Sequence, residues 1–188
     1  MFGLTATAFY LTYAIRELGA PEGESGWFTI VISVGTAMAL FWGMLADRTN
    51  NRVALCLATV LLIVAPMWVL AAPTRLSLYP VIFLTAVAMS SLDVTGYNVQ
   101  LEFSSAAQVP RYVALYAAVQ FVPRFAAPLI GGAMADRIGF RPVFVMASLS
   151  SVASLLALIR MRDPRGRIEA QDDPAGAARL DAVDDPPL

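Results

Sequence analysis

Two ten-residue stretches, GMLADRTNNR at residues 43–52 and GAMADRIGFR at residues 132–141, decide how this chain is organised. They lie 89 positions apart and agree at five of ten places: the glycine, the alanine, the Asp-Arg pair and the closing arginine. Each is a short polar phrase in an otherwise apolar chain. The repetition indicates that one structural unit occurs twice.

The composition is that of a membrane protein. Of 188 residues, 58% are hydrophobic and 14% are charged, and the mean hydropathy is +0.65. A soluble domain carries about 25% charged residues. The net charge of -1 and the scattered arginines provide no basic patch, so we expect no binding to nucleic acid.

The residue inventory excludes several chemistries. The chain has no histidine and one cysteine, Cys56, which rules out a histidine-based catalytic triad, a His/Cys zinc site and an internal disulfide. We expect no metal and no cofactor. We also expect no enzymatic activity, because no nucleophile or metal-ligand spacing accompanies the few intramembrane charged residues.

Six apolar segments approach the roughly 20 residues that a transmembrane helix needs. They are Phe2–Ile15, Trp27–Ala46, Val53–Ala72, Leu78–Asn98, Tyr112–Ala135 and Val143–Ile159. The first is the shortest. We expect a six-helix transmembrane bundle over residues 1–162. A disordered cytoplasmic tail over residues 163–188 follows, because that stretch is rich in Asp, Pro, Ala and Gly and lacks an apolar period.

The two polar stretches predict an inverted repeat. Three predicted spans separate Asp47 from Asp136, so these residues should lie on opposite faces of the bilayer. Each stretch also ends the second helix of a triplet. A three-helix unit followed by its upside-down copy is a building rule of secondary transporters. The sequence therefore predicts an all-α membrane protein made of two inverted three-helix repeats.

The arginines near the span ends predict the orientation. Seven lie on the side of the first stretch and four on the other side. The seven are Arg48, Arg52, Arg111, Arg160, Arg162, Arg165 and Arg167, and the four are Arg16, Arg75, Arg137 and Arg141. The positive-inside rule then places both termini in the cytoplasm. The absence of lysine indicates a GC-rich bacterial source, hence the bacterial cytoplasmic (inner) membrane.

The first stretch resembles the signature loop of the major facilitator superfamily, G-x-L-A-D-R-x-G-R-R, which joins the second and third helices of each six-helix half. PLIGGAMADRIGFRPVF, residues 128–144, resembles the end of the family's fifth helix and the turn into its sixth. NVQLEFSSAAQVPRYVALYAAV, the MRDPR ending and the tail are more similar to a carboxyl-terminal half.

The chain departs from the family pattern in two ways. Asn50 and Asn51 replace the usual Gly-Arg, and six spans are present where the family has twelve. Asparagine tolerates the left-handed conformation better than most residues, so we expect the turn to be preserved with one positive charge fewer.

The resemblance implies gating and structural roles, not substrate contact, for Gly43, Asp47, Arg48 and Arg52. The second motif copy comprises Gly131, Gly132, Asp136, Arg137 and Arg141. The alternative for Gly43 is helix packing, because Gly35, Ala39 and Gly43 form a ladder of small residues at four-residue spacing.

Two ionisable residues, Asp93 and Arg124, fall inside predicted spans. Each would cost several kcal/mol facing lipid at the bilayer centre, so both should face the bundle interior or water. Helical spacing predicts two polar stripes, Ser90, Asp93, Tyr97 and Gln100 on one helix and Tyr116, Gln120 and Arg124 on the next. A smaller polar face, Thr29, Ser33 and Thr36, would serve a water-filled path or bond to neighbouring helices.

The stripes permit two interpretations. In the first, Ser90, Asp93, Tyr97, Gln120 and Arg124 line a transport path. Asp93 is then a candidate proton acceptor, and Arg124 is its partner or an anchor for an anionic substrate. In the second, Asp93 and Arg124 form a structural ion pair that only holds two helices together.

These features predict a secondary active transporter that moves a small solute by alternating access. The chain is half the family's length, so its expected partners are membrane lipid, a small-molecule substrate and a second six-helix half, with proton coupling left open. That half would come from another copy or, as we favour, from the same longer chain, of which this is a fragment. The alternative is a six-helix membrane scaffold or assembly partner without transport.

Overall fold

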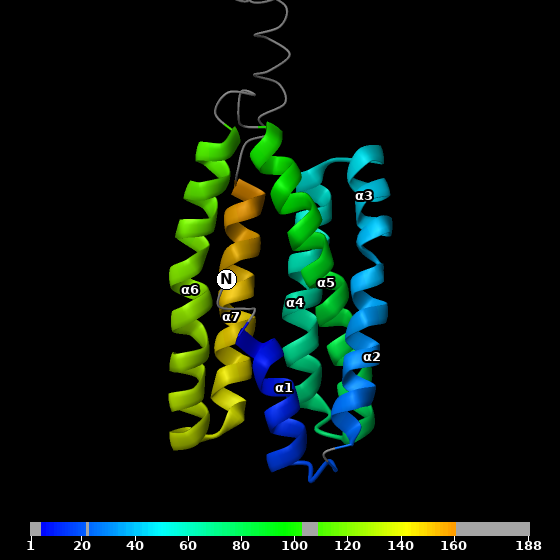
Figure 1. Ribbon diagram of the computed structural model, residues 1–188. Coiled ribbons are helices and arrows are strands. Elements are labelled where there is room, and N and C mark those ends of the chain that lie inside the picture. Colours follow the sequence, from blue (N-terminus) through cyan, green and yellow to red (C-terminus); the bar gives the residue numbers. More distant parts are fainter. Residues whose placement is uncertain (1–4, 22, 103–108, 161–188) are drawn as a thin grey trace, which may run out of the picture.

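The computed structural model describes residues 5–21, 23–102 and 109–160, and the regular structure in these ranges is helical. The helices are α1 (Thr5–Arg16), α2 (Glu24–Ala37), α3 (Ala39–Arg48), α4 (Asn51–Ala71), α5 (Arg75–Glu102), α6 (Val109–Ile138) and α7 (Phe140–Arg160). They form one bundle in which the helices run side by side (Figure 1). The chain reverses direction from one helix to the next, except that α3 continues the direction of α2. The predicted all-helical membrane fold is therefore confirmed.

Five helical segments are long and apolar enough to cross a membrane, by length and composition. They are Glu24–Arg48, Asn51–Ala71, Arg75–Gly96, Val113–Ile138 and Phe140–Arg160. These correspond to the second to sixth predicted spans. The first predicted span overlaps α1, a helix of 12 residues that ends one residue later, at Arg16. The last described residue is Arg160, so the predicted tail lies outside the described residues.

The second predicted span is interrupted at Met38, where α2 ends and α3 begins. The Met38 N–H bonds to the carbonyl of Gly35 at 3.2 Å, a step of three residues instead of four. The polar face of α2 explains part of this bend, because hydroxyls that bond to their own helix four residues back tend to bend it. The hydroxyls of Thr29, Ser33 and Thr36 all do so, at 2.8–2.9 Å. In the described part of the chain these hydroxyls form no bond to a neighbouring helix, which was one of the two alternatives for this face.

The two motif copies lie at opposite ends of the bundle. The first copy ends α3 at the upper end of Figure 1, and the second ends α6 at the lower end. Three helices, α4, α5 and α6, carry the chain from one copy to the other. This arrangement is the one that the inverted repeat requires.

The duplication extends to the packing of α4 and α7. Each helix has 21 residues, and their first residues lie 89 positions apart, the offset of the two motif copies. The two helices pack against each other. Five buried positions of α4 have a buried counterpart in α7 at this offset: Asn51 and Phe140, Ala54 and Val143, Ala58 and Ala147, Thr59 and Ser148, and Leu62 and Ser151.

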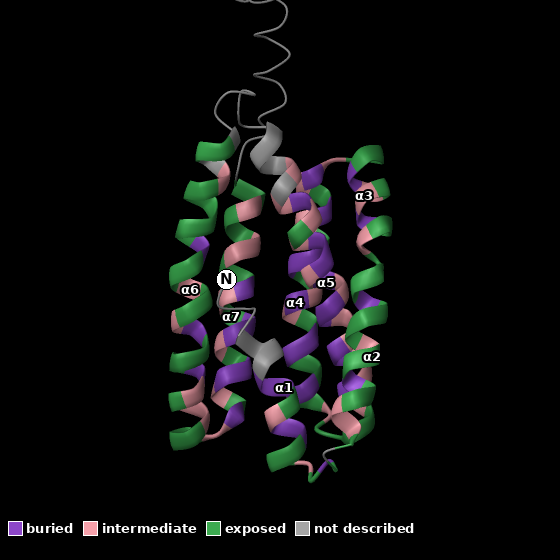
Figure 2. Ribbon diagram, in the orientation of Figure 1, coloured by how far each residue is buried: buried purple, intermediate pink, exposed green. Residues whose placement is uncertain are grey.

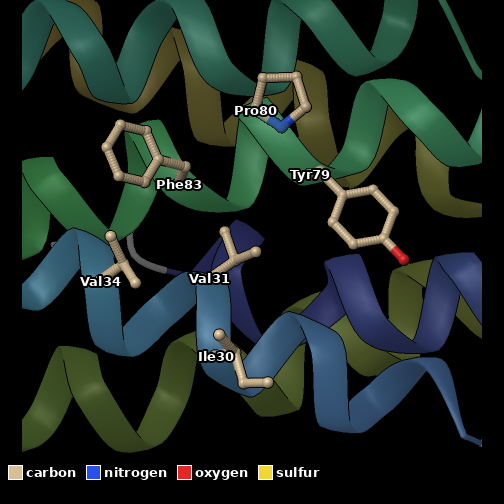
Figure 3. Close-up of a pocket in the computed structure, with 6 residues that line it drawn as sticks. All are labelled: Ile30, Val31, Val34, Tyr79, Pro80 and Phe83. Carbon is tan, nitrogen blue, oxygen red and sulfur yellow. The ribbon is translucent and has the colours of Figure 1, made fainter.

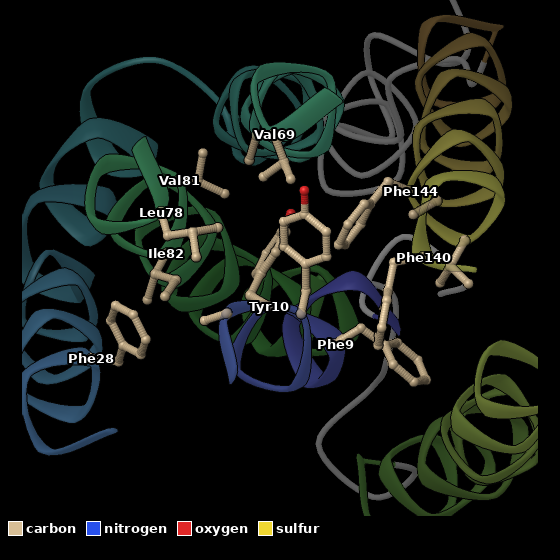
Figure 4. Packing of buried hydrophobic residues seen from close by; sticks show 14 of the residues in the cluster. Phe9, Tyr10, Phe28, Val69, Leu78, Val81, Ile82, Phe140 and Phe144 are labelled. Atoms are coloured by element: carbon tan, nitrogen blue, oxygen red, sulfur yellow. The ribbon is translucent and has the colours of Figure 1, made fainter. Parts of the chain in front are cut away.

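The largest core cluster lies where α1 meets α4, α5 and α7 (Figure 4). The ring centroid of Phe144 on α7 lies 5.5 Å from that of Tyr10 and 5.4 Å from that of Tyr13, both on α1. Phe140 lies 5.6 Å from Tyr13. Aromatic pairs at such separations contribute about 0.5–1.5 kcal/mol beyond their burial. These contacts hold the short α1 in place.

Burial is uneven across the bundle. Much of α4 and α5 is covered, whereas α2, α3 and α6 expose most of their surface (Figure 2). On α6 the exposed large apolar side chains are Leu115, Tyr116, Val119, Phe121, Val122, Phe125, Leu129, Ile130 and Ile138. A surface of this kind belongs against lipid or against another transmembrane body.

Candidate functional site

The first motif copy forms the turn from α3 to α4. Asn50 is extended, with φ of -166°, and its side chain accepts a hydrogen bond of 3.0 Å from the backbone N–H of Arg52. It therefore caps the N-terminus of α4. Among the described residues, only glycines have a positive φ. The expected left-handed turn at the two asparagines is therefore wrong, because Asn50 acts as a helix cap.

This turn is tied to two other helices. The Arg52 guanidinium donates a hydrogen bond of 2.5 Å to the carbonyl of Ile159, near the end of α7. Asn51 is buried and accepts a long hydrogen bond of 3.5 Å from the Asn98 amide of α5. The sequence did not single out Asn98. The position of Asn98 along α5 gives no sign that its side chain lies next to the first residue of α4.

Gly43 has no packing role within the described part of the chain. A Cβ atom at Gly43 would meet nothing within 4 Å, and the same is true at Gly132 in the second copy. By contrast, a Cβ atom at Gly35 would lie 2.6 Å from the Cβ of Ala86 on α5. The ladder of small residues on this span therefore packs closely at Gly35, and packing among the described helices does not explain Gly43.

The second motif copy forms the turn from α6 to α7. Gly139 closes the turn with φ of +87°, a conformation that glycine adopts readily. Asp136 forms an ion pair with Arg16 at the end of α1, with 2.9 Å between Nη1 and Oδ1. The other motif residues differ in burial: Gly131 is buried, whereas Asp47, Arg48, Arg137 and Arg141 are exposed.

Asp93 and Arg124 both lie on the outer surface of this bundle. Both residues are exposed, and no ion pair joins them in the described part of the chain. The structural ion pair is therefore wrong, and neither residue is buried among the described helices, which leaves the expected alternative that they face water. A charge at membrane depth requires water or a polar partner. Each of these exposed charges therefore needs water or a polar partner outside the described helices.

The remaining path candidates differ in their surroundings. Ser90 is buried, and its hydroxyl donates a hydrogen bond of 2.8 Å to the Val87 carbonyl of its own helix. Gln120 is also buried, although most of α6 is exposed. The side chain of Tyr97 lies outside the described residues. Ser90 is therefore buried and bonded to its own helix, and its part in a transport path stays a prediction.

The Tyr116 hydroxyl of α6 reaches α5 next to the predicted polar stripe of that helix. The hydroxyl oxygen of Tyr116 lies 2.9 Å from where a Cβ atom would stand on Gly96, so only glycine fits there without a shift. Gly96 is three residues from Asp93, on the same side of α5. The sequence did not single out Gly96. A glycine beside a polar stripe, opposite a tyrosine on the next helix, was the available signal.

An apolar groove of about 320 Å³ lies between α2 and α5 (Figure 3). Its lining residues are Ile30, Val31, Val34, Tyr79, Pro80 and Phe83. It contains no charged side chain and none of the path candidates, so it does not suit a polar solute. In the part of the chain that the structure describes, no group of His, Cys, Asp and Glu is placed to hold a metal ion.

Comparison with known proteins identifies the family. The family model described as Major Facilitator Superfamily matches residues 1–183. Searches of the curated proteins and of the solved structures gave no match. Because the family match covers nearly the whole sequence, the chain belongs to the major facilitator superfamily, a family of membrane transporters. The resemblance carried by the two motif copies is confirmed.

Proposed function

We propose that this chain forms one six-helix half of a secondary active transporter, which moves a small solute by alternating access. The solute path lies between this half and a second one, supplied by the same longer chain or by another copy. The similarity of NVQLEFSSAAQVPRYVALYAAV, residues 98–119, to the corresponding family segment favours the carboxyl-terminal half.

One observation carries this proposal: Asp93 and Arg124 are both exposed on the surface of a transmembrane bundle. Either charge would cost several kcal/mol against lipid. Their own bundle provides no ion pair between them among the described residues. A water-filled path between two halves satisfies both charges, and it makes Asp93 a candidate proton acceptor and Arg124 a candidate anchor for an anionic solute.

The inverted repeat supports alternating access. Proteins built this way place the substrate site between repeats and expose it to each side in turn. Here the two motif copies end α3 and α6, at opposite ends of the bundle (Figure 1). Each copy is therefore positioned to serve the opening on its own side.

We further propose that the protein lies in a bacterial inner membrane with both termini in the cytoplasm. The excess of arginines at the end of the bundle that carries Asp47 supports this orientation. To test it, single cysteines would replace Asp47 or Asp136 in a Cys56→Ala background. An impermeant thiol reagent added to intact cells should label the cysteine at 136 and not the one at 47. Labelling of both would overturn the inverted topology.

Uptake by reconstituted vesicles tests the transport function. The chain would be purified together with any half that accompanies it, placed in liposomes and screened with labelled small solutes. The expected result is solute accumulation that an imposed pH gradient enhances. If no solute accumulates with or without the gradient, and the chain is recovered within a larger membrane assembly, the scaffold function replaces transport.

A further inference from the structure

The ion pair between Arg16 and Asp136 joins helices that are far apart in the sequence. Arg16 ends α1, and Asp136 lies in the last turn of α6. The two side chains are 61% and 68% exposed, so water reaches the pair. An exposed pair is weak and is screened by salt. It can therefore form and break without a large energetic barrier.

The same end of α1 is also held from the other side. The Arg75 Nε, at the start of α5, donates a hydrogen bond of 2.8 Å to the carbonyl of Leu18. Its Nη2 donates to the carbonyl of Gly19, which turns the chain with φ of +60°. Cations at the C-terminus of a helix are favourable because the last carbonyls lack partners. The end of α1 therefore bridges α5 and α6.

At this level α6 is otherwise held by Met134 and Ala135, half-buried side chains that pack against the largest core cluster. Its buried described residues are Gln120, Ala127 and Gly131. It packs chiefly against α7, to which Gly139 connects it directly. The Arg16–Asp136 pair is thus a polar tie on a helix that is otherwise loosely covered.

At the opposite end of the bundle, the described residues form no equivalent tie. Asp47 is the counterpart of Asp136 in the first motif copy, and it forms no ion pair in the described part of the chain. The residue 89 positions after Arg16 is Ser105, which carries no charge. Among the described residues, the two carboxylates of the repeat therefore differ, because Asp136 has a cationic partner and Asp47 does not.

We propose that Arg16 is a further gating residue, which latches α1 to α6 through Asp136 when the end of the bundle opposite Asp47 is closed. The latch opens when that end admits or releases solute. This proposal rests on the proposed transport function, because a latch between moving helices has a role only if the helices move. The weakness of an exposed pair suits a contact that must break in each cycle.

The separation of the two helix ends tests the latch. Spin labels on Glu17→Cys and Arg137→Cys, in a Cys56→Ala background, would report the distance between α1 and α6 in lipid nanodiscs. Arg16→Gln or Asp136→Asn should raise the ratio of long to short distances by about two- to fivefold. The exchange Arg16→Asp with Asp136→Arg should restore the original ratio. High salt should raise the ratio of long to short distances in the parent protein, as the single variants do. It should leave the ratio of the Arg16→Gln variant unchanged.

Arg111→Gln is the matched control, because it removes an exposed charge at the far end of α6, outside both motif copies, and should leave the ratio unchanged. The latch is overturned if Arg16→Gln leaves the ratio unchanged, or if the exchange fails to restore it while circular dichroism shows a folded bundle. The measurement does not depend on uptake. If the variants change the distance ratio but no solute is taken up, the transport function is overturned and the ion pair between α1 and α6 stands. If solute is taken up but the variants leave the distance ratio unchanged, only the latch is overturned.

Discussion

The indole Nε1 of Trp42 donates a hydrogen bond of 2.8 Å to the carbonyl oxygen of Val87, and this bond fastens α3 to α5. Trp42 is buried and follows the break at Met38 by one turn. The Ser90 hydroxyl donates to the same carbonyl at 2.8 Å. The helix that carries the first motif copy is therefore joined to α5 within two turns of Asp93.

Replacing Trp42 with phenylalanine should lower the free energy of unfolding by about 1 kcal/mol or somewhat more. A net hydrogen bond contributes about 0.5–1.5 kcal/mol, and the smaller ring leaves space behind. The Val87 carbonyl keeps its bond from Ser90, so the loss stays modest. Thermal unfolding in detergent, followed by a dye that reacts with Cys56, would measure it. Trp27→Phe is the control, because Trp27 is 61% exposed, and equal losses would contradict the role of the bond.

Gly35→Ala and Gly43→Ala should have opposite effects on stability. The new methyl group at position 35 would lie 2.6 Å from the Cβ of Ala86, so α2 and α5 must separate, at a cost of about 1–3 kcal/mol. At position 43 it meets nothing within 4 Å, and alanine favours the helix by up to about 1 kcal/mol. The same unfolding assay compares them. If Gly43→Ala lowers uptake while raising stability, the gating role of Gly43 is supported. If Gly35→Ala and Gly43→Ala lose the same stability, the close contact at Gly35 and the open space at Gly43 are contradicted.

Gly96→Ala and Tyr116→Phe should be strongly coupled. The added methyl group would lie 2.9 Å from the Tyr116 hydroxyl oxygen but 3.9 Å from the ring carbon that bears it. Removing the hydroxyl therefore relieves the clash, and the double variant should be more stable than the sum of the single losses by about 0.5–2 kcal/mol. A double-mutant cycle on unfolding measures this coupling. Gly26→Ala with Tyr116→Phe is the control, since a Cβ at Gly26 meets nothing within 4 Å. If the stability losses of Gly96→Ala and Tyr116→Phe simply add, the prediction is wrong.

Asp93→Asn and Arg124→Gln should each reduce uptake by roughly tenfold or more, which corresponds to about 1.4 kcal/mol, with little change in stability. Both side chains are exposed and form no ion pair with each other, so neither supports the fold through a partner on the other helix. Exchanging the two charges should not restore uptake. Uptake with and without a pH gradient would be compared with that of Arg111→Gln, an exposed arginine near the start of α6. Full recovery on charge exchange would restore the ion-pair interpretation.

Asn50→Ala should destabilise the bundle by about 1 kcal/mol, because the first turn of α4 loses the cap on the Arg52 N–H. Asn50→Ser should retain most of this stability, since a serine side chain also caps well. The cysteine-reactive dye assay distinguishes these variants. A gain in stability from Asn50→Gly would instead indicate the left-handed turn that the structure does not have.

Sequence reasoning reached the family, the helical membrane fold and the placement of the two motif copies at opposite ends. Each follows from properties written along the chain, namely apolar length, spacing and a repeated phrase with Asp47 in one copy and Asp136 in the other. It also predicted polar stripes on two successive helices, and the Tyr116 hydroxyl oxygen of one stripe lies close to Gly96, which is not a member of the other. It was wrong about the conformation of Asn50. Asparagine tolerates the left-handed conformation, but here its side chain accepts a hydrogen bond from the Arg52 N–H, which requires an extended backbone.

The sequence by itself determined which residues share a helix face, because the helical period places side chains around their own axis. Only the tertiary structure decided that Asp93 and Arg124 point outward without pairing and that Arg16 meets Asp136. The rotation and tilt of one helix against another depend on how all the side chains between them pack. No spacing within a single helix contains that information.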